Sequence, residues 1–181
     1  GVSRHTRLDY NILKTLADQI SKQSELRKFI KYFPNSSYYF YNEGIRYTEI
    51  KGNQNSVKYE LTKIDSNPLL KEILTIAQEG LSLNDNFGVL ISKYDATQEE
   101  IQNYIVDLIE AQVLQSEFFP SVTGPEYLIR IFESVKRLAE RCKSPEISNI
   151  LEKLTTIKLS LDRLDLNLYN DPIDYQKIET L

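Results

Sequence analysis

The chain has 181 residues, is 41% hydrophobic and carries a net charge of −4, which suits one domain or one compact module with helical flanks. This composition excludes a wholly disordered chain, and no apolar run approaches the ~18 residues that a membrane span needs. The single cysteine, Cys142, excludes an intrachain disulfide, and no signal peptide is visible, so we expect a cytoplasmic protein. Because the sequence contains no methionine, we expect a fragment of a longer protein.

Amphipathic helices are predicted on both sides of a central segment. Asp9 can cap a helix over residues 10–22, and Ser24 can cap a shorter helix that follows it. Two more helices are expected over residues 125–142 and from Ser144 onward, before a C-terminal loop. In each segment, apolar residues recur at the three- and four-residue spacing of one helix face.

Three strands are predicted between these flanks, over residues 38–43, 45–51 and 57–64. Turn-forming residues separate them, including Gly44 and Gly52. In the third segment, apolar residues alternate with polar ones, namely Val57, Tyr59 and Leu61 with Lys58, Glu60 and Thr62. This period of two predicts a strand with one buried face.

Three helices are predicted after the strands. Asn67 and Pro68 are a capping residue and a first helical residue, and Thr97 opens a capping box for the third helix. Between them, Ser82 and Asp85 resemble a capping box for a short helix.

The order of these elements predicts an α+β fold. We expect a winged-helix-like peptide-recognition module, with a three-stranded antiparallel sheet plus three helices, flanked by amphipathic helices. The expected divisions are residues 1–35 as an N-terminal helical flank, 36–120 as the winged-helix module and 121–181 as a C-terminal helical segment.

A winged helix suggests DNA binding, but the charge of its third helix argues against that function. Residues 97–117 contain no lysine or arginine and five carboxylates, at Glu99, Glu100, Asp107, Glu110 and Glu117. Such a helix would repel the phosphate backbone, which supplies most nonspecific affinity. Residues 1–32 hold seven Lys/Arg against three Asp/Glu. Contact with tRNA along this flank therefore stays open, although ordinary solvated helix faces are the simpler explanation.

Peptide binding fits the residues better. An extended peptide can add to an exposed sheet edge, and the strand at 57–64 is the candidate edge, with the third helix as the other wall of a groove. The candidate contacts are Val57, Tyr59, Leu61, Ile101, Tyr104, Ile105 and Leu108. Ile101, Ile105 and Leu108 are more often plain core residues, whereas a tyrosine can present both an apolar ring and a solvated hydroxyl.

Catalytic patterns are absent from the sequence. The one histidine, His5, is expected to be a surface or structural residue, and Cys142 has no histidine near it in sequence. No Cys/His spacing predicts a metal site, and no glycine-rich loop predicts a phosphate site.

Five stretches, taken together, resemble a known family. They are residues 4–9, 32–39, 44–49, 107–117 and 120–126, with Asn35-Ser36-Ser37-Tyr38 and Gln112-Val113-Leu114-Gln115-Ser116-Glu117 as the most specific pieces. The ordered series resembles the N-terminal, glutamylating domain of lantibiotic dehydratases (class I lanthipeptide dehydratases), up to about residue 140.

The resemblance implies an enzyme that transfers glutamate from glutamyl-tRNA, its co-substrate, to Ser or Thr of a precursor peptide. A separate domain then eliminates glutamate to leave dehydroamino acids. It also implies a winged helix that holds the leader of the precursor as an added strand against the third strand. Arg4, Arg7 and Asp9 fall where the glutamylation site continues. The rest of that site and the elimination domain would lie outside this chain, so the chain alone should be inactive and hold no cofactor.

Two questions stay open at this point. The chain could be a stand-alone winged-helix protein-interaction or regulatory module, which predicts a complete short gene. The sequence also leaves open whether the protein forms a homodimer.

Overall fold

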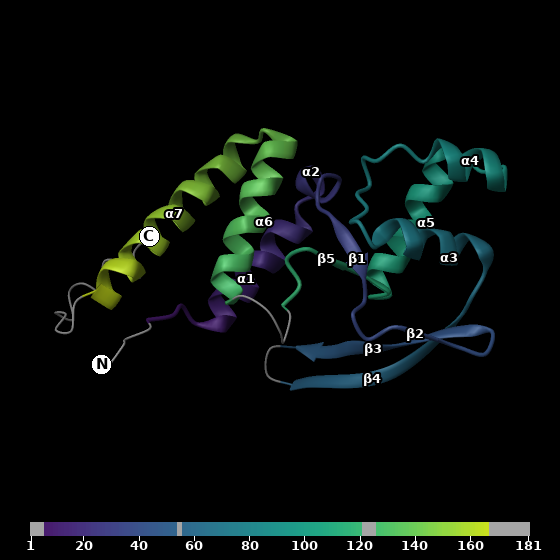
Figure 1. Ribbon diagram of the computed structural model, residues 1–181, viewed down its shortest axis with the longest axis horizontal. Coiled ribbons are helices and arrows are strands. Elements are labelled where there is room, and N and C mark those ends of the chain that lie inside the picture. Colours follow the sequence, from purple (N-terminus) through teal and green to yellow (C-terminus); the bar gives the residue numbers. More distant parts are fainter. Residues whose placement is uncertain (1–5, 54–55, 121–125, 167–181) are drawn as a thin grey trace. The chain divides into compact units, whose positions relative to one another are not determined.

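The computed structural model describes residues 6–53, 56–120 and 126–166, which fall into two compact units (Figure 1). One unit comprises residues 23–119, and the other comprises the described parts of residues 1–22 and 120–181. The division therefore differs from the predicted one. Residues 23–35 belong with the sheet-bearing unit because strand β1 (Tyr32–Pro34) pairs with strand β5 (Leu114–Ser116).

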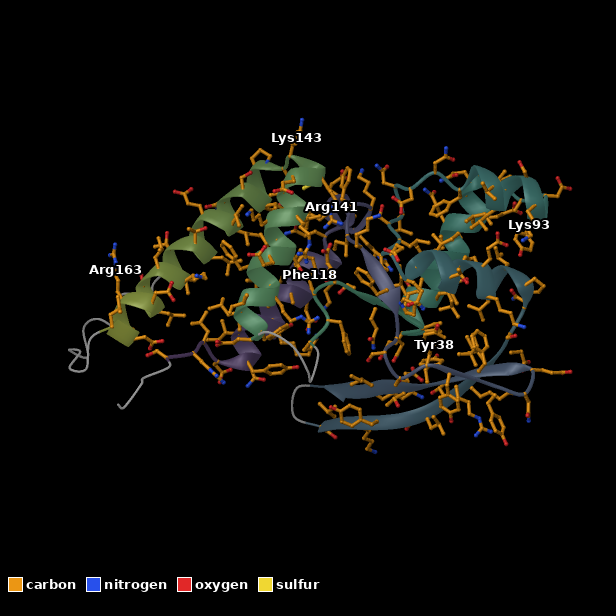
Figure 2. All side chains as sticks on the ribbon, in the orientation of Figure 1. Tyr38, Lys93, Phe118, Arg141, Lys143 and Arg163 are labelled. Atoms are coloured by element: carbon orange, nitrogen blue, oxygen red, sulfur yellow. The ribbon has the colours of Figure 1, made fainter. Side chains whose placement is uncertain are left out.

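The unit that comprises the described parts of residues 1–22 and 120–181 is the first unit, and residues 23–119 are the second. The first unit is helical and consists of α1 (Tyr10–Lys22), α6 (Tyr127–Cys142) and α7 (Pro145–Leu166). Helix α6 contacts both others. The buried apolar residues of this unit are Leu13, Ala17, Ile20, Leu128, Ile131, Val135, Leu138, Ile147, Leu154, Leu161 and Leu164. Lys143, labelled in Figure 2, has a φ of 48° and ends α6 in the left-handed conformation that lets the chain turn into α7. The long predicted helices of both flanks are thus present, whereas the short helix predicted from Ser24 through Tyr32 ends at Arg27. The predicted C-terminal loop lies outside the described residues.

The second unit contains the predicted three-stranded sheet. Its strands are β2 (Tyr39–Tyr41), β3 (Gly44–Asn53) and β4 (Ser56–Asp65), in the antiparallel order β2-β3-β4. The paired strands β1 and β5 were not predicted, because three residues are too few to show a period of two. In Figure 1, β4 forms the margin of the sheet farthest from the helices of this unit.

Helices of the second unit are α2 (Ser24–Arg27), α3 (Pro68–Ala77), α4 (Gly88–Tyr94) and α5 (Gln98–Glu110). The predicted caps of α3 and α5 are confirmed: Asn67 Oδ1 accepts from the N–H of Leu70 at 2.7 Å, and Thr97 and Glu100 form a capping box. The predicted cap of α2 was wrong, because Gln23 rather than Ser24 occupies the N-cap position, and its side chain makes no capping hydrogen bond.

The predicted helix start at Ser82 was also wrong. Asp85 does accept from the Ser82 N–H at 2.8 Å and from its hydroxyl at 3.0 Å, but these bonds close a turn and α4 begins only at Gly88. Lys31 Nζ adds an ion pair to Asp85 at 3.1 Å. Across the described ranges, no helix combines the length and the apolar composition that a bilayer crossing requires.

This turn makes the stability of the chain depend on pH. Burial by itself would raise the pKa of Asp85, but the hydrogen bonds from Ser82 and Lys31 outweigh it and hold that pKa below its ordinary value of 3.8. A lowered pKa in the folded state contributes stability above the unfolded-state value and loses it as the pH falls through the folded-state value. We expect the stability difference between wild type and Asp85→Asn to be constant above about pH 5 and to shrink in more acidic solution.

Urea unfolding at a series of pH values measures this difference. The Lys31→Met variant removes one of the groups that lower the pKa of Asp85, so it should show a smaller pH dependence than wild type. Parallel curves for wild type and Asp85→Asn down to the acid limit would contradict the assignment.

Candidate functional site

One face of the β2-β3-β4 sheet packs against helices of the second unit. Ile45 and Tyr47 of β3 are buried on this inner face, and the Tyr47 hydroxyl donates to the carbonyl of Ala111 at 2.7 Å. Burial is the largest cause that raises the pKa of Tyr47, and the nearby Glu49 carboxylate raises it further. The buried side chains of β3 therefore define which face of the sheet packs against the helices.

The alternating apolar residues of β4 lie on the opposite, outer face. Register pairs Val57, Tyr59 and Leu61 with residues of β3 that alternate with Ile45 and Tyr47. Their side chains are 52%, 70% and 63% exposed, respectively. The prediction that these residues form a buried face was wrong, because the alternation gives two faces but not which one meets the core.

Aromatic residues of β2 extend this outer face. Tyr39 and Tyr41 pair with Arg46 and Gly44, and both are exposed. The guanidinium of Arg46 lies 4.1 Å from the ring centroid of Tyr41. Thus the outer face carries Tyr39, Tyr41, Val57, Tyr59 and Leu61 as exposed apolar side chains.

The main-chain groups of the same β4 residues point to the free edge of the sheet. Both Thr48 and Ile50 bond on the side of β3 away from β4: Thr48 to Ser37 and Asn35, and Ile50 to Gln112. In an antiparallel ladder, residues opposite such positions also turn their N–H and C=O groups outward. Tyr59 and Leu61 stand opposite Ile50 and Thr48, so their main-chain groups face the outer side of β4.

Buried polar side chains fix β3 to the end of α5. Asn35, 2% exposed, donates from Nδ2 to the carbonyls of Thr48 at 3.0 Å and Gln112 at 2.9 Å. Its Oδ1 accepts from the N–H and the hydroxyl of Ser37. Gln112 clamps Ile50, accepting from its N–H and donating to its C=O, each at 2.9 Å. Strand β3, which lies next to β4, is consequently held by these hydrogen bonds on the side that faces away from β4.

Asn35 and Gln112 are the residues that sequence reasoning missed. No local pattern marks either, but both fall inside the two stretches that carry the family resemblance most specifically. Glu117, in the second stretch, accepts from the N–H of Lys31 at 3.0 Å, and its own N–H donates to the Lys31 carbonyl at 2.8 Å. These stretches therefore join β1, β3 and β5 to the C-terminal end of α5.

The predicted contacts on the third helix are not brought onto the exposed surface. Ile101, Ile105 and Leu108 of α5 are buried, so a peptide could reach them only if they left the core. Tyr104 is half-buried, and its hydroxyl accepts from Asn67 Nδ2 at 3.1 Å, just beyond the end of β4. The exposed part of the predicted surface thus consists of Val57, Tyr59 and Leu61.

Charged residues occupy the inner face of the sheet toward its hairpin end. Lys51 Nζ lies 2.8 Å from a Glu60 carboxylate oxygen and 3.4 Å from one of Glu49. The hydrogen bond that Lys51 donates to the Glu60 carboxylate is the largest cause that raises the pKa of Lys51, and Glu49 raises it further. Lys58 stands directly opposite Lys51 in the register.

Tyr38 ties β2 to α3 (Figure 2). Its hydroxyl accepts from Gln78 Nε2 at 3.0 Å, and its ring meets that of Phe40 edge-on, 5.9 Å between centroids. Side-chain hydrogen bonds therefore link the sheet to the ends of α3 and α5, while no strand of the described residues pairs with the outer edge of β4.

Candidate glutamylation residues lie in the first unit. Arg7 is largely exposed and its Nε is 3.6 Å from a carboxylate oxygen of Glu126. Asp9 Oδ1 accepts from the N–H of Asn11 at 2.7 Å, at the start of α1. Arg4 lies outside the described residues. The assignment of these residues to a glutamylation site stays a prediction.

Among the described residues, no strand pairs with the outer edge of β4, and the chain is therefore an α+β protein whose sheet can accept a further strand. Within this class the chain belongs to the family described as "Lantibiotic dehydratase, N terminus", whose model matches residues 2–180. The resemblance seen in the sequence is thereby confirmed.

The fold is also similar to a solved structure, the tRNA dependent lantibiotic dehydratase MibB from Microbispora sp. 107891. The TM-score is 0.60 at 13% sequence identity, and the match covers 90% of this chain. It covers 16% of the MibB chain, so this chain corresponds to a small part of that protein. No curated protein matches the sequence.

Proposed function

We propose that this chain holds the leader of a ribosomal precursor peptide for a lantibiotic dehydratase. In this proposal, β2, β3 and β4 with α3, α4 and α5 act as a winged-helix recognition element. The leader adds as a further strand along the free edge of β4. The observation that carries the proposal is the coincidence, at Tyr59 and Leu61, of outward main-chain groups with exposed apolar side chains.

Strand addition explains why these features occur together. A guest strand would gain main-chain hydrogen bonds from the β4 edge and side-chain contacts from the outer face. The clamps from Asn35 and Gln112 hold β3 in place, so the edge is formed before a guest arrives and less ordering entropy is lost on binding. Family membership and the likeness to MibB support a peptide and a tRNA as partners of the parent enzyme.

The chemistry of the parent enzyme is part of the same proposal. Glutamyl-tRNA would donate glutamate to Ser or Thr of the bound precursor, and a further domain would eliminate it. Arg4, Arg7 and Asp9 would contribute to the glutamylation site from the first unit. The role of this chain is then to position the precursor rather than to react with it.

A proline substitution tests strand addition. The N–H of Tyr59 faces the free edge, so Tyr59→Pro removes a donor to the guest while the β3–β4 ladder keeps its bonds. The matched control, Tyr59→Ala, loses the same side chain but keeps the N–H. We expect the proline variant to bind about five- to thirtyfold more weakly than the alanine variant, since one lost hydrogen bond plus edge distortion costs about 1–2 kcal/mol.

The measurement is fluorescence anisotropy with a labelled synthetic leader of the precursor encoded beside the gene. Circular dichroism of both variants checks that the sheet persists. Equal affinities for the proline and alanine variants would move the guest away from this edge. Failure of the wild-type chain to bind the leader at all would overturn the proposed function.

A further inference from the structure

The charged side chains on the inner face of the sheet are unequally paired. Lys51 Nζ contacts carboxylate oxygens of both Glu60, at 2.8 Å, and Glu49, at 3.4 Å. Lys58 stands directly opposite Lys51 in the register and so faces a like charge. Within the part of the chain that the structure describes, no carboxylate forms an ion pair with Lys58. Lys58 therefore presents an exposed ammonium group on the strand at the margin of the sheet (Figure 1).

The register of β4 decides what a guest strand meets at this margin. Tyr59 turns its main-chain groups outward, so an antiparallel guest forms a hydrogen-bonded pair at this residue. Guest residues opposite Lys58 and Glu60 then occupy the positions between hydrogen-bonded pairs, where Cα atoms approach to about 4.5 Å. Their side chains lie on the inner face, beside the ammonium of Lys58 and the carboxylate of Glu60. The guest therefore meets two positions of opposite charge, two residues apart.

We propose that Lys58 and Glu60 set the register of the leader strand, and that Lys58 pairs with an acidic residue of the leader. This inference rests on the proposed function, because it names the charge that the peptide site selects. An aspartate or glutamate opposite Lys58 forms an ion pair and offsets the repulsion from Lys51. The same residue opposite Glu60 meets a like charge, which is destabilising directly across a strand pair.

Side-chain alternation makes the choice of register a step of two residues. A slip by one residue would turn every guest side chain to the other face of the sheet, whereas a slip by two keeps each on its face. The outer face is apolar at Val57, Tyr59 and Leu61 alike, so it distinguishes poorly between registers two residues apart. On the inner face, the same slip moves an acidic residue from Lys58 to Glu60. The two charges therefore supply the discrimination that the apolar contacts lack.

A double-mutant cycle tests the ion pair. The probe is the labelled synthetic leader of the precursor encoded beside the gene, with each acidic residue changed in turn to its amide. One of these changes should weaken binding to the wild-type chain about two- to fivefold at low ionic strength, the range of cross-strand charge pairs. The same change should have no effect on Lys58→Gln, which keeps a long polar side chain without the charge. The matched control, Lys136→Gln on an exposed position of α6, should keep the full effect.

An exchange of the two charges tests the register. The variant that combines Lys58→Glu with Glu60→Lys keeps the net charge, and both new side chains stand opposite a complementary charge in the hairpin, at Lys51 and Glu49. The positive position is then displaced by two residues along β4. The leader should bind this variant with near wild-type affinity, but in a register that is moved by two residues. A nitroxide on the leader measures the register through the broadening of β4 amide signals in NMR spectra.

Fluorescence anisotropy measures the affinities, and circular dichroism checks that each variant keeps the sheet. Equal affinities of the leader and all of its amide variants would overturn the ion pair, and an unchanged register in the exchange variant would overturn the role in register. Leader binding at the β4 edge that is indifferent to both changes leaves the proposed function standing and refutes only the part played by Lys58 and Glu60. A wild-type chain that binds no leader refutes the proposed function and this inference together.

Discussion

Replacing Asn35 with leucine is expected to lower the free energy of unfolding by about 2–5 kcal/mol. Leucine has the branched shape of asparagine but is larger, so the loss comes from broken hydrogen bonds and from overpacking, and not from a cavity. The carbonyls of Thr48 and Gln112 and the N–H of Ser37 would each lose their bond to this side chain. A buried polar group without a partner costs about 1–3 kcal/mol.

Urea unfolding followed by circular dichroism measures this loss. The matched control is Asn103→Leu, which makes the same change on an exposed position of α5 and should alter stability by no more than about 0.5 kcal/mol. Similar effects of the two substitutions would show that the Asn35 hydrogen bonds add little. A larger loss at Asn35 supports its role in joining β3 to the end of α5.

Truncating Gln112 to alanine is expected to destabilise the chain by about 1–3 kcal/mol and to speed amide hydrogen exchange at Ile50. The side chain makes two hydrogen bonds with Ile50, both at 2.9 Å, and alanine makes neither. The backbone φ of Gln112 is 59°, a conformation that alanine tolerates no better, so the truncation relieves no strain.

Hydrogen exchange followed by NMR separates this effect from general loss of stability. Exchange at Ile50 should rise more than exchange in α6, which belongs to the other unit. The control, Gln98→Ala, changes an exposed glutamine in the first turn of α5 and should leave exchange at Ile50 unchanged. Because Ile50 pairs with Tyr59, the Gln112 variant should also bind the leader more weakly. Unchanged protection at Ile50 would show that β3 holds its place without this clamp.

Local features of the chain were predictable because short-range forces decide them. The Asn67 and Thr97 caps follow from hydrogen bonds that span three residues, and both helices begin where predicted. The three strands follow from aromatic and alternating residues between turns. Predictions failed where a local pattern had two structural outcomes, as at Ser82, whose bonds with Asp85 close a turn instead of opening a helix.

Family membership and the order of the longer helices and of strands β2, β3 and β4 were determined by the sequence alone, through motifs and periodicities read within short windows. Only the tertiary structure decided which face of β4 is exposed. Its alternation permits either outcome, and burial of Ile45 and Tyr47 in the neighbouring strand selects one. Gln112 likewise forms hydrogen bonds with Ile50 and Asn35, which lie 62 and 77 positions away in the sequence. Such contacts form only when the chain packs, so no local sequence pattern predicts them.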